Sequence, residues 1–265
     1  MQETMFKPGD EDPENIRYKK IQKELYYSLI DRHFNSRMLS HLIVKKLKRR
    51  IVSRDKLLIT PCTEINGLLV FDNKKLDGGG LRYTYDYLRI MAHYGLVNSK
   101  NIFEFCCGPA YIGYTLLGAR YCQRLTLSDI NPIAIQAVNK TAQYNGLSEE
   151  VTIIESDCLD SIPESERWDV VVGNPPHYDY PIEDRSYGNM LVSDPGWEIH
   201  KTFYSNVGRF MNPGGYVILL EDGKQSAPDT FSSMISSGGG KLIGAKKGRD
   251  FLGEHNKMYF LASRW

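Results

Sequence analysis

After Gly95, segments with the hydrophobic pattern of strands alternate with segments that have the periodicity of helices, and this alternation predicts the fold class. Short apolar runs predict strands at residues 102–105, 125–127, 151–154, 170–172 and 216–220. Helical spacing predicts helices at residues 111–121, 132–144 and 197–211. Two last apolar runs, 241–243 and 258–262, predict a closing pair of strands. Strands that alternate with helices need crossover connections, which give a mostly parallel sheet covered by helices on both faces. The chain is therefore predicted to be an α/β protein.

The pattern before Gly95 is different. Residues 1–14 are acidic and polar, whereas 13–51 show apolar positions at helical spacing and end in a basic cluster at 45–50. That cluster fits either a solvated helix end or a contact with a phosphate backbone. Further predicted elements are strands at 57–59 and 68–71, a loop at 78–80 and a helix at 83–94. We predict two parts: a mainly helical region at 1–81 that covers the substrate, and an α/β domain at 82–265.

Composition restricts the protein to a soluble globular class. The chain has 265 residues, of which 42% are hydrophobic and 25% charged, and 33 Lys and Arg balance 32 Asp and Glu. This balance does not suggest an obligate nucleic-acid binder. The sequence has no apolar run long enough for a membrane span and its start does not resemble a signal peptide, so we expect a cytoplasmic location with no membrane partner. Its five cysteines lack the spacing of a zinc site, so we expect reduced thiols and no metal.

Three predicted strands end in acidic residues, which indicates a ligand site at one edge of the sheet. The first strand leads into Glu104 and a loop of small residues up to Gly113. The second ends at Asp129, where a carboxylate can accept both hydroxyls of a ribose, and the third at Asp157, where it can accept an adenine amino group. Parallel sheets bind ligands at the carboxyl ends of their strands.

A dinucleotide site is the obvious competitor for this pattern. Gly108, Ala110 and Gly113 loosely fit the GxGxxG/A fingerprint, and an acid follows about twenty residues on. However, Pro109 removes one backbone N–H from the loop that would bind a pyrophosphate. Glu104 also places a negative charge there, which repels phosphate but suits an ammonium group. Charge therefore favours S-adenosylmethionine, which carries an amino group and a sulfonium and no phosphate, over NAD.

The segment Asn174-Pro175-Pro176-His177 follows the predicted strand at 170–172. Each proline fixes its own φ angle and restricts the residue before it, so this loop is rigid. The Asn174 side chain and the neighbouring carbonyl are then preorganised acceptors for the N–H groups of a substrate. An ordinary turn at the end of a strand is the alternative interpretation.

Taken together, these motifs resemble class I S-adenosylmethionine-dependent methyltransferases over residues 82–265. The last motif resembles the (N/D)PP(Y/F/W) signature of the branch that methylates planar nitrogens. The resemblance implies a Rossmann-like seven-stranded sheet, order 3-2-1-4-5-7-6, with the last strand antiparallel. It implies S-adenosylmethionine contacts from the residues Glu104, Phe105, Cys106, Gly108, Ala110, Gly113, Asp129, Ile130, Asn131, Asp157, Cys158 and Asn174.

The same resemblance implies catalytic roles for Asn174, Pro175 and His177. Asn174 and the Pro175 carbonyl would accept the two N–H bonds of the target nitrogen. His177 replaces the usual aromatic residue, so stacking or hydrogen bonding, base catalysis and a structural role all stay open. Candidate substrate contacts are Pro176, Tyr178, Tyr180, Trp197 and Glu221. His200 is expected to be a packed or capping residue.

These observations predict an N-methyltransferase that acts on a small molecule or peptide. An RNA base or a protein amide is the alternative acceptor, with RNA the less expected partner because the net charge is near zero. A cofactor-binding subunit without activity and an NAD-dependent oxidoreductase are the other functions considered.

Overall fold

The computed structural model describes residues 62–76, 79–180, 192–248 and 257–265. The helical pattern at 13–51, the basic cluster within it, and the predicted strand at 57–59 lie outside these residues. The division of the chain near residue 81 therefore stays a prediction.

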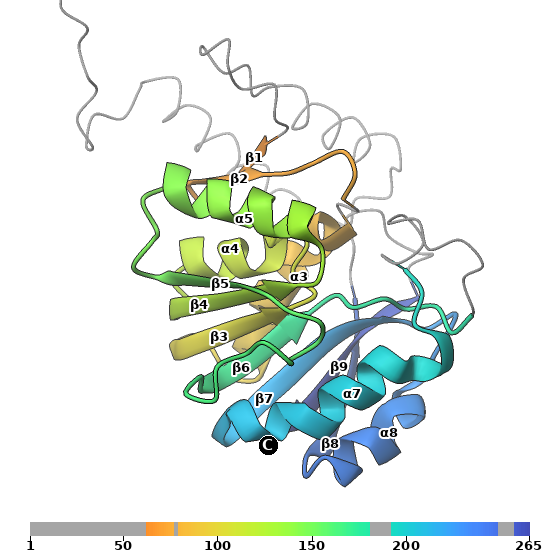
Figure 1. Cartoon of the computed structure of the whole chain (residues 1–265). Helices are drawn as coiled ribbons and strands as arrows, with labels where there is room; N and C mark the ends of the chain where they lie inside the picture. Colours follow the sequence, from red (N-terminus) through yellow and green to blue (C-terminus); the bar gives the residue numbers. More distant parts are fainter. Residues whose placement is uncertain (1–61, 77–78, 181–191, 249–256) are drawn as a thin grey trace, which may run out of the picture. The chain divides into compact units, whose positions relative to one another are not determined.

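A seven-stranded sheet forms the centre of the domain (Figure 1). Its strands are β3 (Ser99–Phe105), β4 (Cys122–Asp129), β5 (Val151–Glu155), β6 (Trp168–Gly173), β7 (Met211–Asp222), β8 (Lys241–Lys247) and β9 (Met258–Arg264). They lie in the order β5-β4-β3-β6-β7-β9-β8. The first five are parallel, and β9 pairs antiparallel with both β7 and β8. The predicted α/β fold, the strand order 3-2-1-4-5-7-6 and the antiparallel last strand are confirmed.

Helices cover both faces of this sheet, as Figure 1 shows. The helices are α3 (Thr84–His93), α4 (Tyr111–Gly118), α5 (Pro132–Tyr144), α7 (Glu198–Val207) and α8 (Pro228–Ser237), with 3-10 turns η1 (Gly79–Tyr83), η2 (Pro195–Trp197) and η3 (Gly208–Phe210). The buried apolar residues of α3 and α4, with Val138 and Ala142 of α5, belong to one hydrophobic cluster, and those of α7 and α8 to another. The α5 helix begins at Pro132 after its N-cap Asn131, the start that the sequence predicts.

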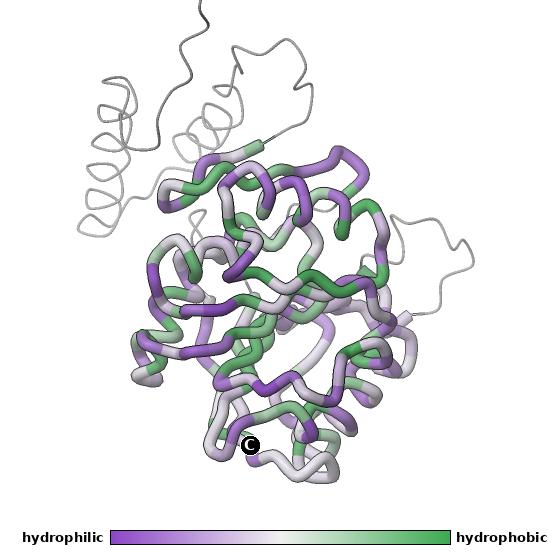
Figure 2. Tube along the Cα trace, turned by 60° about the vertical axis from the view of Figure 1, so that its left-hand side comes forward, coloured by the Kyte–Doolittle hydropathy of each residue, from purple (hydrophilic) through white to green (hydrophobic). Residues whose placement is uncertain are grey.

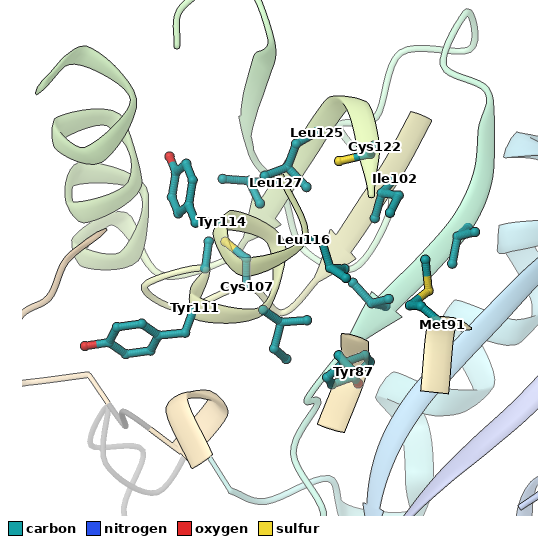
Figure 3. Close-up of a cluster of buried hydrophobic side chains, with 14 of the residues drawn as sticks. Tyr87, Met91, Ile102, Cys107, Tyr111, Tyr114, Leu116, Cys122, Leu125 and Leu127 are labelled. Carbon is teal, nitrogen blue, oxygen red and sulfur yellow. The ribbon is translucent and has the colours of Figure 1, made fainter. Parts of the chain in front are cut away.

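The two clusters arise because side chains alternate across each strand. In β7, Ile218 and Leu220 join the cluster of α3 and α4, whereas Val217 and Leu219 join that of α7 and α8. Both faces are covered, so the strands read as continuous apolar runs, and Figure 2 shows these hydrophobic stretches along the described trace. Figure 3 shows part of the first cluster, around α4.

A small hairpin precedes the sheet. Its strands β1 (Cys62–Ile65) and β2 (Leu68–Phe71) pair antiparallel. The backbone of Leu69 exchanges two hydrogen bonds of 2.9 Å with the Asn145 side chain at the end of α5. The Phe71 N–H donates to Thr141 Oγ1 at 2.9 Å. These bonds attach the hairpin to helix α5, so the described residues Leu69 and Phe71, which precede residue 82, pack on the α/β domain.

Two elements differ from the sequence prediction. The expected helix at 197–211 is divided into η2, α7 and η3, and β7 begins at Met211, so the segment Asn212–Gly215 is part of a strand instead of a helix stop. Gly214 has φ 81° there, and its N–H donates to the Trp265 carbonyl at 2.6 Å. Helix α8 was not predicted, because only Phe231 and Ile235 are buried among its mainly polar residues.

Tyr87 of α3 fixes the end of β6. Its ring is fully buried, and its hydroxyl donates to the Gly173 carbonyl at 2.5 Å, immediately before Asn174. A Cβ atom on Gly173 would lie 2.6 Å from the Phe105 carbonyl oxygen, so only glycine fits between β3 and this tyrosine. Tyr87 lies in the helix predicted at 83–94, and the structure adds the hydrogen bond.

We expect Tyr87→Phe to lower the free energy of unfolding by about 1–3 kcal/mol, because a buried carbonyl loses its partner. Urea denaturation measures the change. Tyr144→Phe is the matched control, since that ring is 56% exposed. Equal effects of the two substitutions would show that the buried hydroxyl contributes nothing to stability.

Candidate active site

The predicted acidic and polar residues come together at the carboxyl edge of the sheet. In the ladder, Phe105 of β3 lies beside Ser128 of β4 and Gly173 of β6, and Asp129 lies beside Glu155 of β5. The four loops that follow these strands therefore adjoin one another. This is the edge at which parallel sheets bind ligands.

The loop after β3 follows a path that normally requires glycine. Cys106, Gly108 and Ala110 have φ angles of 51°, 50° and 57°. A left-handed conformation costs about 1–2 kcal/mol for a residue with a Cβ atom. Hydrogen bonds hold the loop in this path, because the Cys107 N–H donates to the Ser128 carbonyl and the Ala110 N–H to the Cys107 carbonyl. The two non-glycine residues thus keep the geometry of the glycines they replace.

The buried Glu104 side chain stabilises this loop. Its carboxylate is buried and Oε2 accepts a hydrogen bond of 2.7 Å from the Gly113 N–H, in the first turn of α4. Burial raises the pKa of Glu104 to about 8, although the Gly113 hydrogen bond opposes the rise. A Cβ atom on Gly113 would lie 2.5 Å from this same oxygen. The close approach of helix and carboxylate therefore depends on glycine at 113.

Asp129 connects the first two loops. Its Oδ2 accepts from the Gly108 N–H at 2.7 Å and its Oδ1 from the Asn131 N–H at 2.9 Å. Asn131 in turn caps α5 through a 3.0 Å bond from the Ile133 N–H. The next residue along, Ile130, is 47% exposed. A carboxylate has lone pairs for more than two donors, so an oriented and half-buried Asp129 can still accept ligand hydroxyls.

The loop after β5 presents Asp157 to solvent. The next residue, Cys158, has φ 49°. Burial raises the pKa of the Cys106 thiol well above its usual range, and Asp129, Cys158 and Asp194 raise it further. Both thiols are neutral and behave as packing groups.

The motif after β6 has a defined hydrogen bond of its own. Pro175 and Pro176 are buried, whereas Asn174 and His177 are partly exposed. The His177 Nε2 atom lies 3.0 Å from Asn174 Oδ1. One edge of the His177 ring therefore faces the amide that is the candidate acceptor of substrate N–H groups.

A buried cluster behind His177 was not predicted as a unit. Glu221 and His200 are fully buried, and His200 Nε2 lies 3.1 Å from Glu221 Oε1 while its Nδ1 lies 2.6 Å from Asp194 Oδ2. Glu221 was expected as a substrate contact, and the structure places it at the end of β7 with its side chain fully buried. The sequence held one signal for this cluster. Asp194 precedes the helical turn Pro195–Trp197, and an acidic residue in such a position can cap the start of a helix.

The remaining candidate substrate contacts lie in different environments. The Trp197 ring is 8% exposed and packs edge-to-face on His200 and Phe231, so it is a core residue in this structure. Tyr180 is 46% exposed, and its ring centroid lies 5.6 Å from that of Tyr178. The segment from 177 to 196, which carries Tyr178 and Tyr180, is described only at its two ends. These ends pair, since the His177 and Tyr178 N–H groups both donate to the Val192 carbonyl.

Comparison with known families agrees with this geometry. The model of the methyltransferase small domain family matches residues 68–232, more than half of the chain. The protein belongs to the methyltransferase small domain family. It is an S-adenosylmethionine-dependent methyltransferase of class I, and S-adenosylmethionine is its cofactor.

The curated relatives are named for substrates that take part in translation. A release factor glutamine methyltransferase of Leptospira interrogans is 32% identical over 135 residues, which cover 49% of this chain and 46% of the relative. A ribosomal protein uL3 glutamine methyltransferase of Francisella tularensis is 24% identical over 54% of this chain and 50% of the relative. A ribosomal RNA small subunit methyltransferase C of Actinobacillus pleuropneumoniae is 32% identical over 42% and 31%. The chain thus spans half or less of these relatives.

These names correct one expectation from the sequence. A small molecule or peptide was predicted as the acceptor, with RNA less expected, but the relatives are named for proteins and ribosomal RNA. The prediction failed because it rested on the net charge of the whole chain, which does not report the charge at the site. In the part of the chain that the structure describes, no helix is long and apolar enough to span a membrane.

Solved structures share the fold. A methyltransferase from Pyrococcus furiosus superposes with a TM-score of 0.58 at 14% identity, over 87% of this chain and 98% of that one. The 16S rRNA N2 G1207 methyltransferase of T. thermophilus, solved with AdoMet and guanosine, gives 0.54 at 14% identity, over 77% and 50%. At this identity the likeness shows the fold alone.

We expect Gly113→Ala to lower the free energy of unfolding by about 1–3 kcal/mol, because the new Cβ atom would collide with Glu104 and with Leu125. Urea denaturation measures stability, and calorimetry with S-adenosylmethionine should show weaker binding. Gly80→Ala is the control, since its Cβ atom would lie 3.8 Å from the nearest atoms. If Gly113→Ala behaves like Gly80→Ala, Glu104 does not need the close approach of α4.

Glu104 should make the cofactor-free protein sensitive to pH. Its folded pKa of about 8 exceeds its ordinary value of 4.5, so its proton stabilises the fold fully below 4.5. This contribution disappears as pH rises toward 8, by up to ~1.4 kcal/mol per pH unit. Unfolding free energies of the wild type and Glu104→Gln, compared between these pH values, measure it. A difference that does not vary with pH would mean that Glu104 is ionised in the fold.

Proposed function

We propose that this enzyme methylates a side-chain amide nitrogen of a protein, with glutamine as the target residue. The observation that carries the proposal is the Asn174 loop, which follows β6 at the carboxyl edge of the sheet, next to the loop after β3. A primary amide offers two N–H donors in one plane. Asn174 Oδ1 and the Pro175 carbonyl are two acceptors in consecutive residues that can take them.

The residues at the edge fit the cofactor. Glu104, Asp129 and Asp157 are all acidic, and such a set suits a ligand with an ammonium and a sulfonium better than one with phosphates. Asp129 would hold the ribose hydroxyls, Asp157 and Cys158 would contact the adenine, and Ile130 would pack on its face. The loop from Phe105 to Gly113 would follow the methionine part, with Glu104 nearest the ammonium.

The bound cofactor supplies an electrophilic methyl group on a positively charged sulfur. The protein holds the target nitrogen in line with that methyl group, and alignment of this kind supplies several kcal/mol of barrier lowering. Asn174 and Pro175 accept the N–H bonds, which turns the amide plane toward the methyl group and stabilises charge that develops on the nitrogen. The nitrogen becomes acidic when it is alkylated, so its proton can leave to water.

An RNA base is the second candidate acceptor. One relative is named for small subunit ribosomal RNA, and a structural neighbour was solved with guanosine, whose exocyclic amino group is also a planar nitrogen. Two exposed carboxylates favour a protein acceptor instead. Asp157 and Asp179 lie on the loops after β5 and β6, where a phosphate backbone would be repelled.

Transfer of radioactive methyl groups distinguishes the two classes. Purified release factor, ribosomal protein uL3 and small subunit ribosomal RNA are each incubated with the enzyme and labelled S-adenosylmethionine. We expect label in a protein, and its release as methylamine when acid hydrolysis cleaves the side-chain amide to glutamate. Label in RNA alone would overturn the protein-amide proposal and favour the base.

Asn174→Ala should lower turnover at least tenfold while the dissociation constant of S-adenosylmethionine changes less than threefold, because the amide contacts the acceptor and not the donor. Initial rates with the labelled acceptor and calorimetry measure the two quantities. Asn206→Ala is the matched control, since the Asn206 side chain bonds to the Thr202 carbonyl of α7 and to Arg209 of η3 and belongs to neither ligand loop. Equal losses of turnover and cofactor affinity would show that Asn174 serves the fold.

A further inference from the structure

A row of hydrogen-bonding side chains leads from Asn174 into the protein. His177 contacts Asn174 through Nε2 at 3.0 Å, and its Nδ1 lies 3.6 Å from Glu221 Oε2. Glu221 Oε1 contacts His200, and His200 contacts Asp194. Four separate segments thus supply one continuous row: the loop after β6, the end of β7, helix α7 and the residue that caps it.

The inner part of this row is rigid. Asp194, His200 and Glu221 are each fully buried. Asp194 accepts the Ile199 N–H at 2.8 Å, which ties it to the start of α7. The His200 ring stacks on Phe231 of α8 with centroids 4.6 Å apart. The Glu221 carboxylate therefore has a fixed position, and a side chain that contacts it has a fixed partner.

The protons of His177 follow from its two neighbours. A carbonyl oxygen only accepts, so a contact with Asn174 Oδ1 requires a proton on Nε2. Nδ1 and Glu221 Oε2 then face each other, and both are buried atoms without a hydrogen-bond partner in the described part of the chain. A second proton, on Nδ1, would give each of them a partner. Among the described residues only one other buried side-chain atom is unsatisfied, the Nδ2 atom of Asn131.

Charge favours this arrangement. Burial lowers the pKa of His200, but Glu221 and Asp194 outweigh it and raise that pKa to about 9, so His200 is a cation at neutral pH. Burial raises the pKa of Glu221, but His200 and His177 outweigh it and the pKa is lowered. The carboxylates of Asp194 and Glu221 and the imidazolium of His200 together carry one net negative charge. A second imidazolium, at His177, would cancel this charge.

The other titratable groups near Glu221 do not change this balance. They are the phenols of Tyr87 on α3, Tyr204 on α7 and Tyr259 on β9, all buried. Burial is the largest cause that raises the pKa of each phenol, so the three are neutral at physiological pH.

We propose that Asp194, His200 and Glu221 are positioning residues that keep His177 protonated on both nitrogens, so that His177 fixes the Asn174 amide with its oxygen toward the methyl acceptor. This inference rests on the proposed function, in which Asn174 binds the acceptor. A carbonyl oxygen has two lone pairs, so Oδ1 can accept from His177 and from an acceptor N–H together.

The alternative arrangement gives the opposite orientation. If the Asn174 amide were turned over, its NH₂ group would donate to an unprotonated His177 Nε2, and Nδ1–H would donate to Glu221. Every atom would then have a partner with a neutral ring, but the Asn174 oxygen would point away from His177. The protonation state of the His177 ring therefore reports which way the amide faces.

Nitrogen NMR of the full-length enzyme tests this directly. Imidazole ¹⁵N shifts distinguish the imidazolium from each neutral tautomer, and His177→Gln assigns the signal. We expect an imidazolium in the wild type near neutral pH, and its loss in Glu221→Gln. Glu198→Gln is the control, since Glu198 lies exposed on α7 and pairs with Lys201. A neutral ring protonated on Nδ1 in the wild type would overturn the proposal.

Kinetics tests the role in the reaction, with release factor as the acceptor probe. Glu221→Gln should lower kcat at least tenfold, with less than threefold change in the dissociation constant of S-adenosylmethionine. In His177→Gln, an amide N–H can replace Nε2–H, so kcat should fall less than in His177→Phe. Adding Glu221→Gln to His177→Gln should then lower kcat no more than threefold, because Glu221 acts through the imidazolium. Full additivity would mean that Glu221 does not act through His177.

Two controls distinguish a failure of the positioning role from a loss of stability and from a failure of the proposed function. Glu221→Gln removes a buried charge and lowers stability, so kinetics are measured at a temperature where circular dichroism shows each variant folded. If Asn174→Ala is as active as the wild type, the proposed function fails whatever the ring shows. If Asn174→Ala is inactive but Glu221→Gln keeps full kcat, only the positioning role fails.

Discussion

The candidate site depends above all on one buried hydrogen bond, from the Gly113 N–H to the Glu104 carboxylate. It joins the end of β3 to the first turn of α4, and so determines the path of the loop between them. That path places left-handed backbone at Cys106 and Ala110, where side chains are unfavourable. Asp129 then bonds the same loop from β4 through Gly108. The acids that would hold a cofactor are thus first of all the groups that shape the loop.

The sheet separates two kinds of buried acid. Glu104 lies with α4 on one face, whereas Glu221 lies with α7 on the other, since the odd-numbered residues of β7 join the cluster of α7 and α8. Burial raises the pKa of Glu104, and its backbone amide partners only partly oppose this rise. The pKa of Glu221 is lowered because the His200 cation outweighs the effect of burial. The Asn174 loop lies between them at the edge. Donor and acceptor sides of the reaction are therefore supported from opposite faces of one sheet.

Local sequence predicted most of the sheet but little of the cluster behind His177. The strands and helix α5 were predictable because apolar runs and the Asn131-Pro132 start are local signals. Helix α8 was missed since its apolar stripe is narrow, and the β7 start was missed because long-range pairing overrides a Pro-Gly-Gly stop. The contacts of Glu221 join residues 21 positions apart or more, and no pattern in one strand reveals them. Glu221 is a buried ion because distant segments pack around it, and the local sequence alone does not predict this.

The acceptor illustrates the same limit at the level of function. A count of 33 basic against 32 acidic residues argued against a large RNA, and a small molecule or peptide was then expected as the acceptor, with a protein amide as an alternative. RNA binding needs cations for its phosphates, whereas a protein amide needs two well-placed acceptors and no net charge. The described edge offers acceptors in Asn174 and Pro175 and exposed acids on the adjoining loops. Near-neutral charge is thus compatible with a protein acceptor, and the names of the relatives and the chemistry of the edge favour the same class.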